Sequence, residues 1–503
     1  MAKTAKEKRV PSYGEAYLCV VLVFGIVIGA MILGIPVQAT MLFAAIIAAA
    51  FAYNLGYTWI ELEQALSAKL GHLAPTVCIL WLIGLYLGAN MFSGTLPLLV
   101  KYGFEIISPK FLYVSALLVC SALSVLTGSS WTSVATGGIA CMTIGRILEC
   151  NDAIMAAAII SGAIFGDKIS PMSETTNLAP ACVGNDLWSH VYSQLYTTMP
   201  AWLIAIVFYT VLGLHSGGLA DVPESAVAVI AQLDQIYNLT PVLLLPVIVL
   251  LVLAVMQKPP IPSLIISSAL AIFCGVIFQG PEFTMKVGTV AAISGFKVTS
   301  VAPQGMDILY EVSYLLNRGG MISMANTVMI CYTGFSLTAI MIRCGILDKA
   351  VEPLMNFANT RVKAVFTAEI AIFVVHAVAG ISYLSSVFVG AAWKKCYVKN
   401  KLGLPALSRT LEDVGTTVSC LFPWGQSGAF YMATLGVSIY GAEGYFKYLT
   451  LSYMCPVIAL LLAAFNIGMF NLSDEEQAKL LAELEAEEGH VESMAALEAE
   501  GKA

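Results

Sequence analysis

The chain has 503 residues, of which 58% are hydrophobic and only 11% are charged. Soluble domains carry about 25% charged residues, and a soluble core stops growing at about 250–300 residues, so this composition excludes a soluble enzyme and predicts an all-α polytopic membrane protein. No basic patch is visible, and the net charge is −7, so we expect no nucleic-acid partner.

The first part of the chain is predicted to be a basic N-terminal segment, residues 1–15, followed by a membrane repeat, residues 16–216. Lys3, Lys6, Lys8 and Arg9 precede the first apolar run, which favours a cytoplasmic N-terminus. That run is long and lacks a cleavage site, so we expect no cleaved signal peptide. The repeat should contain spans at 17–35, 37–53, 111–126 and 200–214, amphipathic helices at 57–70 and 185–198, and a re-entrant hairpin at 75–100.

An acidic connecting loop, residues 217–238, leads to a second membrane repeat at residues 239–470. The loop has no Lys or Arg and should face the outside, whereas the lysines between 394 and 401 favour a cytoplasmic connection. The second repeat should contain spans at 239–256, 261–278, 364–378 and 448–470, surface helices within 279–318, a hairpin at 321–342 and a broken apolar region at 414–440. We expect about 10–12 spans in total.

Residues 471–503 form an acidic tail. Ten acidic and two basic residues give this tail a charge of −8, so the rest of the chain carries about +1. Ser473 and Glu476 match the capping-box pattern that starts a helix. A solvated acidic helix is the favoured interpretation, and a dedicated partner site is the alternative.

A polar stretch at residues 165–180 follows the apolar run 153–165 and contains Asp167, Lys168 and Glu174 among hydroxyls and prolines. Polar side chains and broken backbone at membrane depth survive only when they are buried in protein or face a water-filled cavity. Ionisable residues there are candidates for function. An ordinary loop between two membrane helices is the alternative.

Two segments of the chain resemble each other. Residues 128–133 and 380–385 both read Gly-x-Ser-aromatic-x-Ser after an apolar run, and residues 174–180 have a looser echo at 413–423. Paired polar interruptions in two halves are the best sequence indication of a transporter site between repeats. No channel filter sequence is visible. The twelve cysteines form no CxxC pair and the five histidines are scattered, so we expect no enzyme activity, no resident metal and no cofactor.

The motifs resemble those of NhaC-type sodium/proton antiporters in the ion transporter superfamily. The resemblance covers residues 15 to 470 and is carried by residues 126–131, 166–180, 407–413 and 423–424. It implies two inverted-topology repeats with re-entrant hairpins and broken helices, an elevator-like motion and a homodimer surrounded by lipid in the bacterial cytoplasmic membrane. The chain departs from the family pattern at Glu174, commonly Asp, at residues 132–133, at 382–396, and at 425–427, where Gly-Gln-Ser replaces Asn-Thr-Cys.

Oxygen ligands suit Na⁺ as they suit other hard cations, and we expect Na⁺ to bind at Asp167, Glu174 and Thr175. An antiporter needs a buried acid that binds either a proton or Na⁺; Asp167 is the first candidate, Glu174 the second and Asp413 the third. The alternative for Asp167 is a structural ion pair with Lys168 or Arg409. Further ion- or substrate-binding candidates are Thr176, Asn177, Ser129, Ser130, Ser382, Ser385, Thr416 and Thr417.

Glu369 and His376 lie seven residues apart in an apolar run, so a helix would place them on one face. A proton relay is possible, and a helix-end Glu with a hydrogen-bonded His is the alternative. The sequence therefore predicts a secondary transporter that exchanges Na⁺ for H⁺. The alternative is Na⁺- or H⁺-coupled transport of a small organic solute, an amino acid or a carboxylate.

Overall fold

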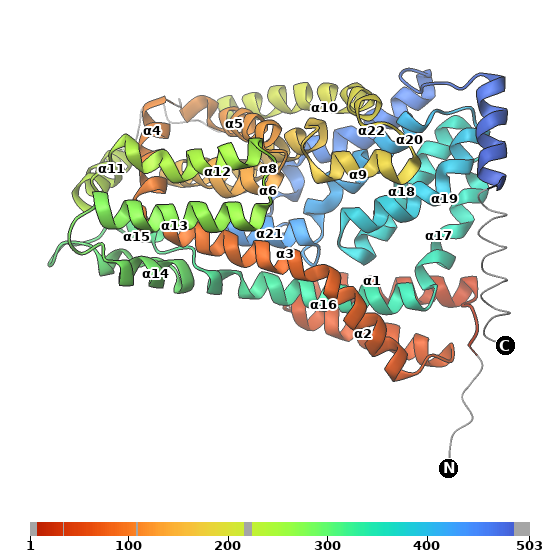
Figure 1. Ribbon diagram of the computed structural model, residues 1–503, viewed down its shortest axis with the longest axis horizontal. Helices are drawn as coiled ribbons and strands as arrows, with labels where there is room; N and C mark the ends of the chain where they lie inside the picture. The colour runs from red at the N-terminus through yellow and green to blue at the C-terminus, as the bar shows by residue number, and fades with distance from the viewer. Residues whose placement is uncertain (1–7, 34, 107–108, 216–223, 487–503) are drawn as a thin grey trace, which may run out of the picture.

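A computed structural model describes residues 8–33, 35–106, 109–215 and 224–486. Within these ranges the chain is helical and has no strand, which confirms the predicted all-α fold (Figure 1). The α-helices of the first half are α1 Tyr13–Ile32, α2 Val37–Asn54, α3 Trp59–Ser93, α4 Thr95–Ile106, α5 Leu112–Thr127, α6 Ser130–Ser133, α7 Ile139–Ile147, α8 Asp152–Ile169, α9 Glu174–Val183 and α10 Leu187–His215.

The second half continues with α11 Glu224–Ile236, α12 Leu245–Val255, α13 Pro260–Phe278, α14 Met285–Ser294, α15 Tyr310–Leu316, α16 Ala325–Arg343, α17 Ile346–Phe357, α18 Arg361–Ala379, α19 Ser382–Lys399, α20 Leu404–Gly415, the 3₁₀ turn η6 Thr417–Leu421, α21 Gln426–Leu435 and α22 Thr450–Phe465. A further helix covers residues 474–486 of the tail, and Ser473 and Glu476 cap each other's backbone N–H groups as the capping-box pattern predicts.

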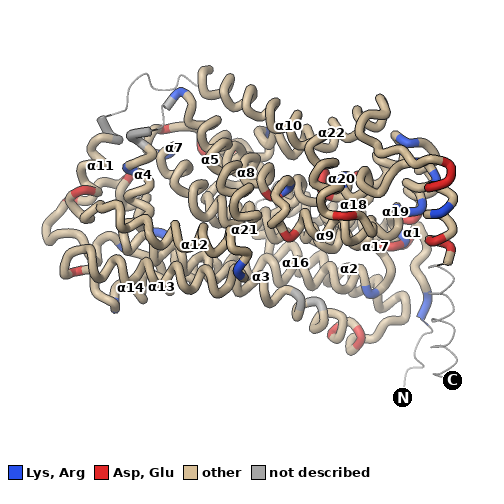
Figure 2. Tube along the Cα trace, turned by 45° about the horizontal axis from the view of Figure 1, so that its top comes forward, with Lys and Arg blue, Asp and Glu red and all other residues tan. Residues whose placement is uncertain are grey.

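Seven of the described helices are long and apolar enough to cross a membrane, or up to nine if each of two bent helix pairs forms one span. The prediction of 10–12 spans also counted shorter apolar helices such as α5 and α22. Figure 2 shows the charged residues gathered mainly towards the two ends of the molecule, with a small group in the middle near α9, α18 and α20. The protein is therefore a multi-pass membrane protein with a few charges in its interior.

Two predicted re-entrant hairpins are wrong in their placement. Residues 59–93 form one 35-residue helix, α3, which continues through Pro75 and so joins the predicted amphipathic helix to the first part of the predicted hairpin. The chain does break within 75–100, at Gly94 (φ +85°), after which α4 begins. Leu73–Ser93 alone is 21 residues long and can span. Likewise, Met321–Arg343 can span as one piece, because the hydroxyls of Thr333 and Thr338 donate to carbonyls of their own helix and leave it unbroken.

Two other boundaries also differ from the prediction. The amphipathic helix at 185–198 and the span at 200–214 are one helix, α10, which runs through Pro200. Of the predicted connecting loop, residues 224–236 form helix α11, and residues 216–223 lie outside the described residues. The part of α11 from Val227 makes a 96° bend with the segment Pro241–Val255.

The predicted breaks at the polar motifs are present in both halves. Helices α8 and α9 are bent by 48° at residues 170–173, and η6 and the turn at residues 422–425 separate α20 from α21. α5 ends at Gly128 and α18 ends at Gly380, and both glycines are left-handed (φ +64° and +69°). A new helix begins two residues later in each case, as expected for related repeats. Their inverted orientation stays a prediction.

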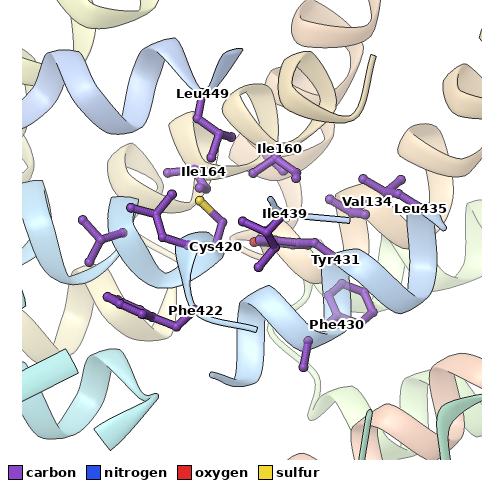
Figure 3. Packing of buried hydrophobic residues seen from close by; sticks show 14 of the residues in the cluster. Val134, Ile160, Ile164, Cys420, Phe422, Phe430, Tyr431, Leu435, Ile439 and Leu449 are labelled. Atoms are coloured by element: carbon purple, nitrogen blue, oxygen red, sulfur yellow. The ribbon is translucent and has the colours of Figure 1, made fainter. Parts of the chain in front are cut away.

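Close packing of small residues holds the broken helices in place. α8 lies against α5, and a Cβ atom on Gly162 or Gly166 would sit 2.2 Å from the Leu117 carbonyl oxygen or 2.4 Å from the Val125 nitrogen. Glycine therefore lets the two backbones approach. Figure 3 shows apolar residues of α8, such as Ile160, in one cluster with Cys420, Phe422 and Tyr431 of the second half.

Candidate functional site

A cavity of about 700 Å³ lies where the breaks of the two halves meet. α9 of the first half packs against α19 and α20 of the second. At the break of α21, the Trp131 indole N–H donates to the Ser427 hydroxyl at 3.3 Å, and the ring stacks on Phe430. Residues of α3, α6, α8, α9, α18, α19 and α21 line the cavity, so neither half encloses it alone.

Asp167 lines this cavity from the last turn of α8. One carboxylate oxygen accepts a hydrogen bond from the Ser130 hydroxyl at 2.6 Å, and the other accepts one from the Ser173 hydroxyl at 2.6 Å. Among the described residues, no basic side chain forms an ion pair with Asp167. It is a half-buried acid held by hydroxyl groups, and the predicted alternative of an ion pair with Lys168 or Arg409 is wrong.

The start of α9 brings most of the other first-half candidates to the cavity. Glu174 and Thr175 line it, Glu174 being exposed, and the Thr175 hydroxyl lies 3.0 Å from that of Ser173. Thr176 is buried, and its hydroxyl donates to the Asp167 carbonyl oxygen at 2.7 Å. Asn177 donates to the carbonyl oxygens of Pro171 and Ser173. These bonds fix the break, so Thr176 and Asn177 stabilise the geometry around Asp167.

Ser129 also lines the cavity, and its hydroxyl caps the short helix α6 by accepting from the Thr132 N–H at 3.2 Å. Because Ser130 follows it directly, this cap places the hydroxyl that reaches Asp167. The Ser129 hydroxyl thus stabilises the start of α6, and the Ser130 hydroxyl donates to the Asp167 carboxylate.

The second-half candidates divide into two pairs. Ser382 and Thr416 line the cavity, and the Ser382 hydroxyl donates to the Gly415 carbonyl oxygen at 2.9 Å. Ser385 and Thr417 are buried behind it, and their hydroxyls donate to backbone carbonyls one turn earlier. The structure therefore brings Ser382 and Thr416 to the site and gives Ser385 and Thr417 local bonds.

Asp413 lies outside the cavity lining, in a fully buried ion pair with Lys168. The Lys168 Nζ is 2.7 Å from Asp413 Oδ1, and both side chains are 0% exposed. The same oxygen accepts from the Thr197 hydroxyl at 2.7 Å, and Arg409 Nε lies 3.8 Å from Asp413 Oδ2. Asp413 thus neutralises cations from α8 and α20 and joins the two halves.

Sequence reasoning missed Glu412, which is 1% exposed beside this pair. Its carboxylate accepts from Gln194 at 3.2 Å and lies 3.6 Å from His190 Nε2, both on α10. His190 and Gln194 lie in the segment 185–198, for which the sequence predicts only an amphipathic helix. The Arg409–Asp413 spacing of four was a usable signal, since such residues are neighbours on a helix, but nothing local to residue 412 pointed to α10.

Glu369 and His376 both lie on α18, as predicted, and both are buried. They do not bond to each other. The Glu369 Oε1 and both ring nitrogens of His376 have no hydrogen-bond partner among the described residues. His376 lines the cavity and stacks on Phe422 at 5.5 Å between ring centroids, whereas Glu369 is not part of the lining. The alternative of a hydrogen-bonded histidine is wrong.

Comparison with known proteins adds the family. Residues 162–467 match the Na⁺/H⁺ antiporter family. The chain is 32% identical to the Na⁺/H⁺ antiporter NhaC of Alkalihalophilus pseudofirmus, with 91% of this chain and 96% of the relative covered. It is 31% identical to an uncharacterized Na⁺/H⁺ antiporter of Haemophilus influenzae, with 93% and 99% covered. A malate-2H⁺/Na⁺-lactate antiporter of Bacillus subtilis is 28% identical, with 91% and 95% covered.

Proposed function

Because the chain belongs to the Na⁺/H⁺ antiporter family, we propose that it is a secondary transporter that exchanges Na⁺ for H⁺ across a membrane. The observation that carries the proposal is Asp167, an acid that faces a cavity between two broken helices and has hydroxyl partners but no ion pair among the described residues. An acid of this kind can take up either cation.

We propose that exchange is a competition for the Asp167 carboxylate. Na⁺ binds the ionised carboxylate and a proton neutralises it, so each cation displaces the other. Glu174 and Thr175 line the same cavity and would complete the Na⁺ site with their oxygens. The hydroxyls of Ser130 and Ser173 now donate to Asp167, and each can rotate so that its oxygen faces a bound cation.

The experiment uses the full chain in liposomes with a pH dye inside. Addition of NaCl outside should drive protons out and make the interior alkaline. Asp167→Asn keeps the size of the side chain and removes the charge, so it should abolish the signal. The matched control is Asp307→Asn, because Asp307 is exposed and outside the cavity. Wild-type exchange by folded Asp167→Asn protein would refute the assignment.

A second candidate function is coupled transport of a small organic solute. The cavity volume of about 700 Å³ favours it, since a bare Na⁺ needs only a shell of oxygens at about 2–3 Å. The malate/lactate antiporter relative points in the same direction. Uptake of a labelled solute that requires a Na⁺ gradient, without any response of the pH dye to NaCl alone, would favour this function over simple exchange.

We further propose a bacterial cytoplasmic membrane as the location, with the N-terminus in the cytoplasm, and a homodimer that works by an elevator-like motion. The resemblance to NhaC-type antiporters supports these points, and the basic start of the chain supports the orientation. Labelling of a cysteine introduced before Tyr13, in whole cells, tests the orientation. Cross-linking of reconstituted protein tests the dimer.

A further inference from the structure

The N-termini of two helices give the cavity a positive character that a cation site does not need. The first residues of α9 (Glu174) and α19 (Ser382) line it, and the residues preceding these helices make no side-chain cap hydrogen bond. Gln426, the first residue of α21, also lines the cavity, but its N–H already donates to the Gly380 carbonyl oxygen at 3.0 Å. The first N–H groups of a helix lack partners within the helix and carry a partial positive charge, which favours anions.

His376 is an independent indication of a ligand. It is 0% exposed to solvent, lines the cavity, and both ring nitrogens are without a hydrogen-bond partner among the described residues. Leaving a buried polar group unpaired costs about 1–3 kcal/mol, and such a group calls for an explanation. A neutral imidazole always has one N–H, which can donate to an incoming acceptor.

We propose that this cavity binds the carboxylate group of a small organic anion, held by the N-termini of α9 and α19 and by an N–H of His376. The inference rests on the proposed function, because Na⁺ at Asp167 would lie in the same cavity and offset the negative charge of Asp167, which would otherwise repel the anion. The solute class is therefore an organic acid that enters together with a cation.

The same groups disfavour a cationic solute such as a basic amino acid. Its positive charge would meet the positive ends of α9 and α19, and it would compete with Na⁺ for Asp167, the acid to which the proposed function assigns that ion. Glu174 and Lys258 both line the cavity and are both exposed, so their opposite charges are screened and favour neither sign of solute.

The first test separates the inference from the proposed function. Reconstituted protein is given labelled lactate, malate or arginine with sodium sulfate as the only other salt, and dye-loaded liposomes are assayed with no organic anion. Na⁺-dependent, saturable uptake of lactate or malate, and none of arginine, is expected. Exchange without carboxylate uptake or binding would overturn the inference and leave Na⁺/H⁺ exchange intact. Arginine uptake would also overturn it.

The second test addresses His376. His376→Phe keeps a ring to stack on Phe422 and removes both nitrogens, so binding of labelled lactate should weaken about tenfold or more, as for a lost hydrogen bond to a charged group. His376→Gln retains an N–H donor and should recover part of the affinity. His215→Phe, on the exposed end of α10, is the matched control. Equal lactate affinity in all four proteins would refute the role of His376.

The third test addresses the helix N-terminus. Ser382→Ala and Ser382→Pro both lose the hydroxyl, but only proline also removes the first N–H of α19. Proline is well tolerated at this helix position, and the preceding residue Ile381 already has the extended backbone (φ −140°, ψ 130°) that a following proline requires. Lactate should bind several-fold more weakly to the proline variant than to the alanine variant. Equal affinity in the two would contradict binding by this N–H.

Discussion

Replacing Lys168 by methionine removes one half of a buried ion pair whose two side chains are both 0% exposed. Breaking such a pair costs about 3–5 kcal/mol, because it leaves an uncompensated buried charge. After this change Asp413 would still have Arg409 Nε at 3.8 Å and the Thr197 hydroxyl at 2.7 Å. We therefore expect the lower end of the range, a loss of about 3 kcal/mol in the free energy of unfolding.

Replacing Asp413 by leucine should cost more. It would leave Lys168 and Arg409 in the interior, two cations with their shared acid removed, so the loss should approach about 5 kcal/mol. The double variant Lys168→Met/Asp413→Leu removes the pair together and should be more stable than Asp413→Leu alone. Its coupling energy follows from the double-mutant cycle.

The assay is reversible unfolding of purified protein in mixed micelles, with free energies extrapolated from the denaturant series. The matched control is the partly exposed pair Lys101–Asp234, also at 2.7 Å, with side chains 26% and 43% exposed. Lys101→Met should cost about 0–1 kcal/mol, as exposed pairs do. If Lys168→Met costs no more than this control, or more than Asp413→Leu, the reasoning from burial and compensation is refuted.

Three further predictions concern other parts of the molecule. Gly128→Ala should lower the free energy of unfolding by roughly 1–2 kcal/mol because its backbone is left-handed, and by a further amount because its Cβ would lie 2.6 Å from Met172. Gly305→Ala is the control, since Gly305 is also left-handed but its Cβ would meet open space. Equal losses of unfolding free energy in the two variants would exclude the clash with Met172. If Asp167 binds the two cations in competition, the Na⁺ concentration for half-maximal exchange should rise about tenfold for each unit by which the pH is lowered, over the acid range in which the carboxyl is mostly protonated. A half-maximal Na⁺ concentration that is independent of pH would contradict this. Ser473→Ala should lower the stability of the tail helix by about 1 kcal/mol, because the helix loses its N-cap. Backbone amide hydrogens of residues 474–486 should then exchange faster with solvent, and an unchanged amide exchange rate would exclude a stabilising role of this cap.

The sequence predicted the helix breaks because they need residue types that are costly in a membrane. Acids, hydroxyls and prolines gather at 165–180, and the bend of 48° between α8 and α9 lies within that stretch. Gly128 and Gly380 are left-handed, a conformation for which glycine is the default residue. These are local consequences of local chemistry, so a single chain reveals them.

The misplaced hairpins show the limit of the same reasoning. The polar side chains in 75–100 and 321–342 are expected to interrupt their helices, yet several bond to carbonyls of their own helix. The Asn90 amide donates to the Tyr86 carbonyl oxygen at 2.8 Å and α3 ends only at Gly94, while Thr333 of α16 donates to the Met329 carbonyl oxygen. A polar side chain that can bond one turn back does not need to break its helix. Composition alone does not distinguish a polar side chain that interrupts a helix from one that bonds to a carbonyl of its own helix.

The pairing of charges was beyond the sequence for a different reason. Lys168 is adjacent to Asp167 in the chain, but successive residues on a helix point in different directions. Lys168 therefore turns away from the cavity to Asp413, 245 residues later, while Asp167 faces the cavity. Which acid a buried cation selects depends on how the halves pack, and only the three-dimensional structure contains that information.

This division of the charges favours Asp167 over Asp413 as the proposed exchange site. Protonation of Asp413 would leave Lys168 and Arg409 buried without their anion, at a cost of several kcal/mol. Among the described residues, protonation of Asp167 affects two hydroxyl partners, Ser130 and Ser173, which can serve as donors or acceptors. The two acids of the paired motifs therefore have different physical surroundings: Asp413 neutralises fixed cations between the halves, and Asp167 is the acid that, in the proposed function, changes its charge with each transported ion.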